Sequence, residues 1–384
     1  MGVVGMKKIW AIGDFLITPL GFSSVDTFEN LLKGESGLKE LSIGSCDFST
    51  WASYFSHSQE KMLAEMVMPI ATTRFERLLF FPLKKVIEEC DIDTRSSKTL
   101  FVFATTKGNI ELIGLENITS SQLSLFVSAQ KISRYFGNPN KPLVVSNACT
   151  SGLSAQILAM RLLQSGEYNT IILGGADTVN PFVLEGFNSL KALSPEPCRP
   201  FDRDRQGINI GEGGAAMVLS SENNGYELND PIELTGGAIT NDANHISGPS
   251  RTGYELAMAA EFAMNQSGIN PEDIDFVSAH GTATLYNDEM EANALNLCRL
   301  SEKPTHSLKG YFGHTLGVAG LMESIVCIHS LRRNILVSSK GFENPGTSKS
   351  LNIIKQNQYQ PLSRCIKTMA GFGGCNAAIC YSKT

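Results

Sequence analysis

The sequence predicts an α/β protein with largely buried strands, and three observations lead to this prediction. Short runs rich in Val, Ile and Phe recur along the chain. Between several of them lie longer stretches in which apolar residues return with the period of a helix. Residues 144–163 and 306–328 also share one order, in which a strand is followed by small residues and then by a helix. Such alternation is typical of layered α/β folds, and the shared order suggests two related halves.

The elements follow one another in a regular order. We expect strands at 100–106, 143–148, 170–178, 215–221, 274–280 and 366–374. We expect helices at 121–136 and 314–333. The stretch 220–231 is polar and rich in turn-forming residues, so we place the internal boundary there. The predicted halves are residues 1–225, which contain the candidate nucleophile, and residues 226–384.

Composition limits the possible functions. The chain has 384 residues with 32 Lys plus Arg and 38 Asp plus Glu, a formal net charge of −6. This mild acidity argues against a nucleic-acid-binding surface. Nine cysteines without paired spacing are typical of a reducing compartment. The apolar N-terminal stretch is interrupted by Lys7, Lys8 and Asp14, which leaves it too short for a membrane span. We therefore expect a cytoplasmic protein that does not insert into a membrane.

Cys149 is placed unusually, in the segment "LVVSNACTSGLSAQILAMRLL" (143–163), where the predicted strand turns into a helix. A helix N-terminus favours a thiolate, so the pKa of this thiol is expected to fall below the ~8.5 of free cysteine. Ala148, Ser151 and Gly152 are small enough to let a substrate approach. Such an elbow also leaves backbone N–H groups free to hold an oxyanion. This stretch alone leaves a buried, inert cysteine as the alternative.

Two histidines occupy comparable turns. His280 directly follows an apolar strand and precedes Gly281. His314 stands between Gly313 and Thr315 at the predicted start of a helix. An imidazole at a helix N-terminus is held neutral and can donate a hydrogen bond. Each histidine alone could be structural, but together with Cys149 they predict a reactive cleft.

Five motifs in a fixed order resemble the β-ketoacyl-[acyl-carrier-protein] synthase family over about residues 7–381. The motifs are "NACTSG" (147–152), "CRPFDRDRQGINIGEGGAAMVL" (198–219), "AHGTATLYNDEMEA" (279–292), "LKGYFGHTLGVAG" (308–320) and "GFGGCNAAI" (371–379). The resemblance implies a thiolase-like fold of two pseudo-repeated βαβαβαββ halves in α-β-α-β-α layers. It also implies an acyltransferase that condenses malonyl-carrier protein with a cysteine-bound acyl group to give a β-ketoacyl-carrier protein.

The resemblance also assigns roles to single residues. It makes Cys149 the acyl acceptor, and it makes His280 and His314 the pair that promotes malonyl decarboxylation. The further roles are a buried ion pair (Lys309 with Glu323), acidic supports (Asp288 and Glu291), hydroxyls for the pantetheine arm (Thr282 and Thr284), and an aromatic gate (Phe372) whose backbone N–H joins that of Cys149 in the oxyanion hole.

The resemblance implies an acyl carrier protein as partner and a homodimer, or a heterodimer with a related ketosynthase-like subunit. Because carrier proteins are acidic, we expect cations to mark the docking face. The candidates are Arg205, Lys131, Arg134, Arg74 and Arg77. Substrates would arrive on a 4′-phosphopantetheine arm, and no metal or redox cofactor is expected.

Two departures from the family pattern favour a specialised pathway, such as polyketide or aryl polyene synthesis, over ordinary fatty acid synthesis. Cys375 stands where the gate motif usually has threonine, and "ATTKGNIELI" (104–113) replaces a glycine-rich segment. Two other classes remain open. A non-catalytic, chain-length-factor-like subunit would normally lack the nucleophile. A thiolase-like or initiating enzyme would use coenzyme A thioesters, and for a thiolase Cys375 or Cys380 is the candidate second cysteine.

Overall fold

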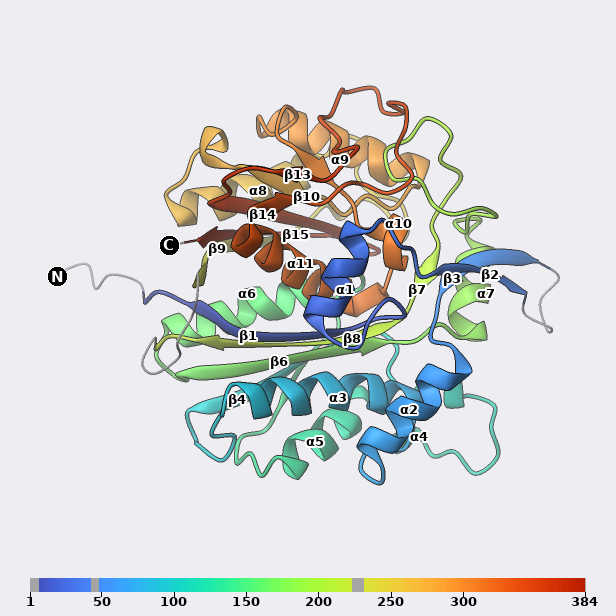
Figure 1. The fold of residues 1–384 in the computed structure, drawn as a ribbon, viewed down its shortest axis with the longest axis vertical. Helices are drawn as coiled ribbons and strands as arrows, with labels where there is room; N and C mark the ends of the chain where they lie inside the picture. The colour runs from blue at the N-terminus through green and yellow to red at the C-terminus, as the bar shows by residue number, and fades with distance from the viewer. Residues whose placement is uncertain (1–6, 43–47, 223–230, 384) are drawn as a thin grey trace.

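The layers of the fold alternate from helix to sheet, helix, sheet and helix (Figure 1). The computed structural model describes residues 7–42, 48–222 and 231–383. The two sheet layers are halves of one ten-stranded sheet, joined where Trp10 and Ala11 pair with Glu233 and Ile232. This architecture confirms the predicted α/β class. The expected boundary at 225/226 lies outside the described residues.

The two half-sheets have the same topology. Counted outward from the join, the strand orders are β1-β8-β6-β4-β5 and β9-β15-β14-β10-β11. In both halves the first two pairings are antiparallel and the last two are parallel. The predicted internal repeat is therefore present in the strand order. The strands are β1 (Trp10–Ile17), β4 (Thr99–Ala104), β5 (Leu143–Val145), β6 (Thr170–Asp177) and β8 (Gly213–Ser220), then β9 (Ile232–Asn241), β10 (Phe276–Ser278), β11 (Thr305–His306), β14 (Arg364–Gly371) and β15 (Cys375–Lys383).

Helices cover both faces of each half-sheet. In the middle layer lie α6 (Ser151–Gln164) and α11 (Ala319–Arg333), with one half-sheet on either side (Figure 1). The outer layers hold α3 (Arg74–Glu89) with α5 (Leu125–Tyr135), and α8 (Tyr254–Ser267) with α9 (Leu285–Leu297). Because helices cover both faces, every residue of β4, β8 and β10 is buried. The six predicted strands are confirmed, as are the two predicted helices, with a break at Ser124 in the first.

Smaller elements surround this core. The strands β2 (Leu38–Ser42), β3 (Ser49–Ser53) and β7 (Ile210–Gly211) form a second sheet, and β12 (Ile335–Leu336) pairs with β13 (Gln358–Tyr359). The remaining helices are α1 (Ser24–Leu32), α2 (His57–Val67), α4 (Ser120–Leu123), α7 (Pro181–Ser189) and α10 (Lys309–Phe312), with short 3₁₀ turns η1 (Ile110–Leu112), η2 (Pro271–Asp273) and η3 (Leu316–Val318). Within the described residues, none of the helices combines the length and apolar character that crossing a bilayer requires.

The two middle helices meet at their N-terminal ends through a pair of glycines. A β-carbon at Gly152 would lie 2.6 Å from the backbone nitrogen of Leu321, and one at Gly320 would lie 2.6 Å from that of Leu153. No larger residue fits either position without moving the facing backbone. Since α6 and α11 begin side by side, the loops that precede them also come together, and these loops contain Cys149 and His314.

Candidate active site

Cys149 lies in a tight turn between β5 and α6. Ala148, directly before it, has a φ of 47°, in the left-handed region that alanine rarely adopts. The hydroxyl of Thr150 donates to the carbonyl of Asn147 at 2.7 Å, and that of Ser151 donates to the carbonyl of Ala148 at 2.6 Å. These short bonds hold the strained turn and fix the direction of the cysteine side chain.

The expected lowering of the Cys149 pKa is wrong. Cys149 is only 9% exposed, and burial raises the pKa of its thiol to about 11. The positive charges of Lys309 and Lys107 and the N–H of Phe372, which donates to the sulfur, oppose this rise without overcoming it. The helix itself begins two residues later, at Ser151. The thiol therefore rests protonated and must pass on its proton when it reacts.

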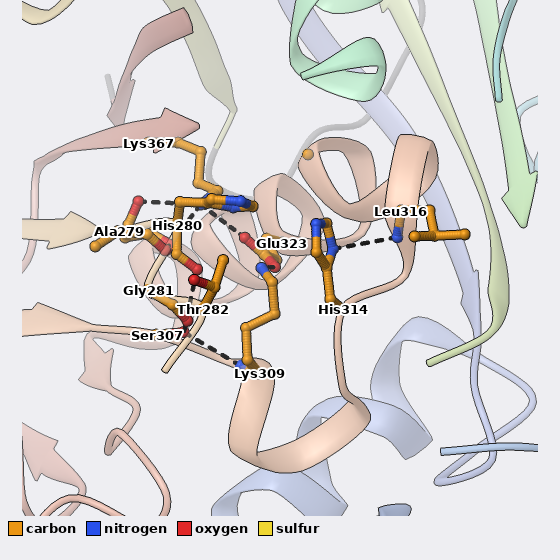
Figure 2. A network of polar contacts seen from close by, with 12 residues as sticks. Ala279, His280, Gly281, Thr282, Ser307, Lys309, His314, Leu316, Glu323 and Lys367 are labelled. Atoms are coloured by element: carbon orange, nitrogen blue, oxygen red, sulfur yellow. Dashed lines mark hydrogen bonds and ion pairs between the residues drawn. The ribbon is translucent and has the colours of Figure 1, made fainter. Parts of the chain in front are cut away.

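His280 and His314 face one another near the thiol. Both are buried, and their ring centroids are 5.0 Å apart with an angle of 81° between the ring planes. The N–H of Leu316 donates to Nδ1 of His314 at 3.2 Å, which places the His314 hydrogen on Nε2 (Figure 2). That Nε2 has no partner among the described residues, and neither has Nδ1 of His280. The site thus keeps imidazole nitrogens free for a substrate.

Both imidazoles are neutral at pH 7. Burial lowers the pKa of His280 and of His314 well below its ordinary value, and the positive charges of Lys309 and Lys367 lower both further. The neutral state agrees with expectation, and burial and the lysines add to its cause. The N–H of Leu316, at the start of η3, also donates to Nδ1 of His314, which favours the neutral imidazole.

The thiol and the two imidazoles form one cluster. The sulfur of Cys149 and a ring nitrogen of each histidine lie within 4.8 Å of one another. They line a cavity of about 470 Å³, whose wall includes Thr282, Thr284 and Phe372. The hydroxyls of the two threonines lie 2.8 Å apart. A thioester that enters this cavity can reach the sulfur of Cys149 and both imidazoles at once.

A buried ion-pair network lies behind the histidines. Lys309 and Glu323 are fully buried and form the predicted ion pair. The structure adds Lys367, also fully buried, whose Nζ is 2.7 Å from Oε2 of Glu323 (Figure 2). Sequence reasoning missed this lysine. The sequence feature that could have indicated it is a single cation inside the apolar strand "IKTMAG", because a charge there needs a buried partner.

Asp288 and Glu291 support the turn that contains His280. Oε1 of Glu291 accepts from the backbone N–H of His280 at 2.8 Å, and Oε2 accepts from that of Gly281 at 2.6 Å. Oδ1 of Asp288 accepts from the N–H of Thr282 at 2.9 Å. Both acidic side chains are fully buried in α9, so they hold the turn from its helix side.

Phe372 follows the end of β14 and borders the cavity. Its ring stacks on that of Phe187, with 5.7 Å between the centroids. Its backbone N–H points at the sulfur of Cys149, which is the position expected of an oxyanion-hole donor. The side chain is 37% exposed, so it borders both the cavity and solvent.

Arg205 does not belong to an exposed docking face, which corrects the expectation from its motif. Its side chain is 3% exposed. One guanidinium nitrogen donates to the carbonyls of Asp202, at 2.8 Å, and Gly346, at 2.6 Å. Nε lies 3.6 Å from Asp288. Arg205 therefore braces the cavity wall, and its motif did not indicate that its side chain would be buried.

The other docking candidates lie on α3 and α5, and none of them lines the cavity among the described residues. Arg74 is 25% exposed and pairs with three carboxylates. Lys131 pairs with Glu76 at 2.6 Å. Arg77 donates to a backbone carbonyl at 3.0 Å, and Arg134 is exposed. Local partners therefore neutralise two of these four cations.

The candidate second cysteines lie outside the reactive cluster. Sγ of Cys375 is 2.8 Å from Oδ1 of Asn147, so this side chain supports the turn before Cys149. Cys380 is fully buried, and burial raises the pKa of its thiol to about 12. Neither position offers the second reactive thiol that a thiolase needs.

Family models cover most of the chain. The model described as "Beta-ketoacyl synthase, N-terminal domain" matches residues 6–224, and "Beta-ketoacyl synthase, C-terminal domain" matches residues 224–343. The 3-oxoacyl-[acyl-carrier-protein] synthase 2 of Vibrio cholerae is 26% identical over 416 residues, which cover 98% of this chain and 99% of that protein.

Solved structures are similar over the whole chain. "The ishigamide ketosynthase/chain length factor" matches with a TM-score of 0.91 and 22% identity, covering 99% of this chain and 100% of that chain. "Ketosynthase (ApeO) in Complex with its Chain Length Factor (ApeC)" from Xenorhabdus doucetiae matches with a TM-score of 0.85 and 26% identity, covering 100% of both chains. These likenesses confirm the thiolase-like fold implied by the five motifs.

Proposed function

Because the chain belongs to the beta-ketoacyl synthase family, we propose that it joins a malonyl unit, with loss of CO₂, to an acyl group on Cys149. Family membership makes it an acyltransferase of the condensing class. The observation that carries the finer proposal is the cluster of one thiol and two neutral imidazoles within 4.8 Å. The product would be a β-ketoacyl group on the carrier.

The first step would load the acyl group. The sulfur of Cys149 attacks the thioester carbon, a new C–S bond forms, and the thiol of the carrier arm leaves. Because the resting thiol is protonated, its proton passes to the leaving sulfur of the carrier arm. The transient oxyanion would accept hydrogen bonds from two backbone N–H groups, those of Phe372 and Cys149.

The second step would break the malonyl unit. As the bond to CO₂ breaks, its electron pair moves into the thioester and leaves negative charge on the carbonyl oxygen. The imidazole N–H groups of His280 and His314 would donate to that oxygen, and one such donor is typically worth ~3 kcal/mol. The resulting carbanion attacks the acyl carbon on Cys149, a C–C bond forms, and the cysteine sulfur leaves.

An acyl carrier protein and a ketosynthase-like second subunit belong to this proposal. The Vibrio cholerae relative is named for an acyl carrier protein, and the ApeO structure holds a chain length factor. β5 is the last strand in the described ten-stranded sheet and exposes Leu143, and such an edge is open to pairing with another chain. We also propose that substrates arrive on a 4′-phosphopantetheine arm and that the reaction needs no metal or redox cofactor.

We further propose a specialised pathway, of the polyketide or aryl polyene kind, in the cytoplasm. The support is the similarity to a protein of Streptomyces cyaneus named "Putative polyketide beta-ketoacyl synthase 1", which is 30% identical over 264 residues that cover 65% of this chain and 63% of that protein. A non-catalytic partner subunit is disfavoured because Cys149 and both histidines are present. A thiolase-like enzyme is disfavoured because Cys375 and Cys380 lie outside the cluster.

The test is incubation with malonyl-carrier protein and a panel of acyl-carrier proteins and acyl-coenzyme A thioesters, read by mass spectrometry. We expect β-ketoacyl-carrier products with the wild type and none with Cys149→Ala. Condensation that proceeds only with coenzyme A thioesters would support the initiating or thiolase-like class instead. Absence of any acyl adduct would support a non-catalytic subunit.

A further inference from the structure

Lys367 has an unusual position for a lysine. It lies on β14, is fully buried, and is one of the largest side chains in the described core. Its Nζ lies 2.7 Å from Oε2 of Glu323 and donates to the carbonyls of Ser278, at 3.2 Å, and Ala279, at 3.1 Å. A third carbonyl, that of Thr368, accepts at 2.9 Å. An interior ammonium with four oxygen partners is a built site rather than a chance burial.

These contacts reach the reactive turn. Ser278 and Ala279 immediately precede His280, so the Lys367 ammonium holds two carbonyls at the strand end that leads into the imidazole (Figure 2). Glu291 holds the backbone N–H groups of His280 and Gly281. The Lys367 ammonium therefore binds carbonyls of this short segment, and the Glu291 carboxylate binds its N–H groups.

Lys367 also changes the charge balance behind the imidazoles. Lys309 and Lys367 reach Glu323 from different sides, and both bind it (Figure 2). One carboxylate therefore has two ammonium partners. Glu291 is the other carboxylate nearby, and its oxygens accept hydrogen bonds from the backbone N–H groups of the turn and from the side chains of Asn287 and Thr368.

The titratable groups around the two imidazoles come from several neighbouring elements. They include Cys149 before α6, Asp288 and Glu291 on α9, Lys309 on α10, Glu323 on α11 and Lys367 on β14. Arg205, Asp242 and His245 line the same cavity. Positive charge from the two lysines disfavours an imidazolium at His280 and at His314. The same positive charge stabilises the negative charge that would develop on the thioester oxygen to which the imidazoles donate.

We propose that Lys367 is a positioning residue for the decarboxylation step: it fixes the His280 turn to Glu323 and adds a second positive charge behind both imidazoles. This inference rests on the proposed function. The two half-reactions should depend on Lys367 to different degrees, because loading of Cys149 uses the N–H of Phe372 rather than the His280 turn. Removal of Lys367 should therefore impair CO₂ release more than loading.

The test compares Lys367→Met, which removes both charge and donors, with Lys367→Gln, which keeps donors without charge. Ile366→Val is the matched control, because it shortens a buried apolar side chain next to Lys367 on the same strand without changing charge. Loading of Cys149 is followed by intact mass. CO₂ release from malonyl-carrier protein is measured between pH 5.5 and 8.5, and folding is checked by thermal unfolding.

For Lys367→Met we expect loading within about two-fold of wild type and CO₂ release at pH 7.5 lower by about ten-fold or more, since a displaced group can cost two orders of magnitude. Without the ammonium the imidazoles are protonated more easily, so the acidic limb of the rate profile should move to higher pH. Lys367→Gln should lose less rate at pH 7.5 but show the same shift. Ile366→Val should keep the wild-type ratio and profile.

Equal losses in both half-reactions at every pH would show a merely structural lysine and overturn the proposal, as would wild-type CO₂ release in Lys367→Met. If Lys367→Met does not fold, Lys367→Gln decides by the same criteria, and failure of both to fold assigns the lysine to stability alone. A wild-type protein that releases no CO₂ would instead overturn the proposed function, and this inference with it.

Discussion

At the scale of single residues, the depth of a side chain decides its chemistry more than its neighbours in sequence do. Cys149 was expected to be acidic because a helix follows it. Burial reverses that effect and raises the pKa of the thiol to about 11. Arg205 was expected at a surface because the family resemblance makes it a candidate for carrier docking, yet it is buried. Residue types and motif order are visible in a sequence, whereas depth is set by segments distant along the chain.

The raised pKa of Cys149 makes a direct prediction. Since only the thiolate reacts, alkylation by iodoacetamide should accelerate about ten-fold for each pH unit between pH 7 and 9, without a plateau. Peptide mass spectrometry of the alkylated protein gives the rate at this residue, and Cys149→Ala should lack the adduct. A plateau below pH 8 would show that the thiol is acidic after all.

The lowered pKa values of His280 and His314 predict a second pH behaviour. A histidine whose pKa lies well below 6.5 stays neutral as the pH falls through 6.5. CO₂ release from malonyl-carrier protein should therefore change less than about two-fold between pH 8 and pH 6. Replacing either histidine with Ala should lower release by about a hundred-fold, while loading of Cys149 continues. A fall centred near pH 6.5 in the wild type would contradict the neutral assignment.

The buried pair of Lys309 and Glu323 predicts strong coupling. Glu323→Gln leaves two ammonium groups in the interior without a carboxylate, which should cost about 3–5 kcal/mol of unfolding free energy. Adding Lys309→Met removes one unpaired charge, so the double variant should lose less than the sum of the single losses. Urea unfolding of the two single variants and the double variant measures this coupling. Strict additivity would mean that the two side chains do not interact.

At the scale of elements, the contact between α6 and α11 sets the distance between the two reactive loops. The helices touch through Gly152 and Gly320, and the loops before them contain Cys149 and His314. The sequence showed both glycines and both reactive residues but not their meeting, because the contact joins segments more than 160 residues apart. Elements were therefore predictable one by one, and their packing was not.

Gly320→Ala tests this contact. The added methyl group would press on the backbone of Leu153, so we expect a loss of about 1–3 kcal/mol in stability. Condensation should fall at least ten-fold because the loops move apart. Gly186→Ala on α7 is the control, since its β-carbon meets no atom within 4 Å and alanine is the better helix former. Unfolding curves and turnover that match for the two variants would refute a special role for the contact.

At the scale of the whole molecule, we expect the carrier to dock around the cavity rather than on α3 and α5, because among the described residues none of the candidate cations on those helices lines the cavity. Lys191 is exposed and lines the cavity of about 470 Å³. An acidic carrier that docks there would be attracted by such a cation, and salt would weaken the attraction. The motifs predicted the partner class, but which cations surround the opening depends on how loops from both halves meet.

Lys191→Glu should therefore lower condensation with a carrier-bound substrate several-fold at low salt. A small pantetheine thioester should still load Cys149 at the wild-type rate, because it needs no protein docking. Arg134→Glu, an exposed cation on α5 outside the lining of the cavity, is the matched control and should leave both reactions unchanged. A carrier reaction that is insensitive to salt and to Lys191→Glu would place docking elsewhere.

The identical strand order of the two halves has a consequence for how such a site can arise. Two separate copies of one half, paired about an axis, would present the same side chain twice where their central helices meet. Joined in a single gene, the copies are free to diverge, so that one contributes the nucleophile and the other the hydrogen-bond donors. In the proposed mechanism the two halves therefore keep one strand order but differ in role: the first half contributes Cys149, and the second contributes His280 and His314.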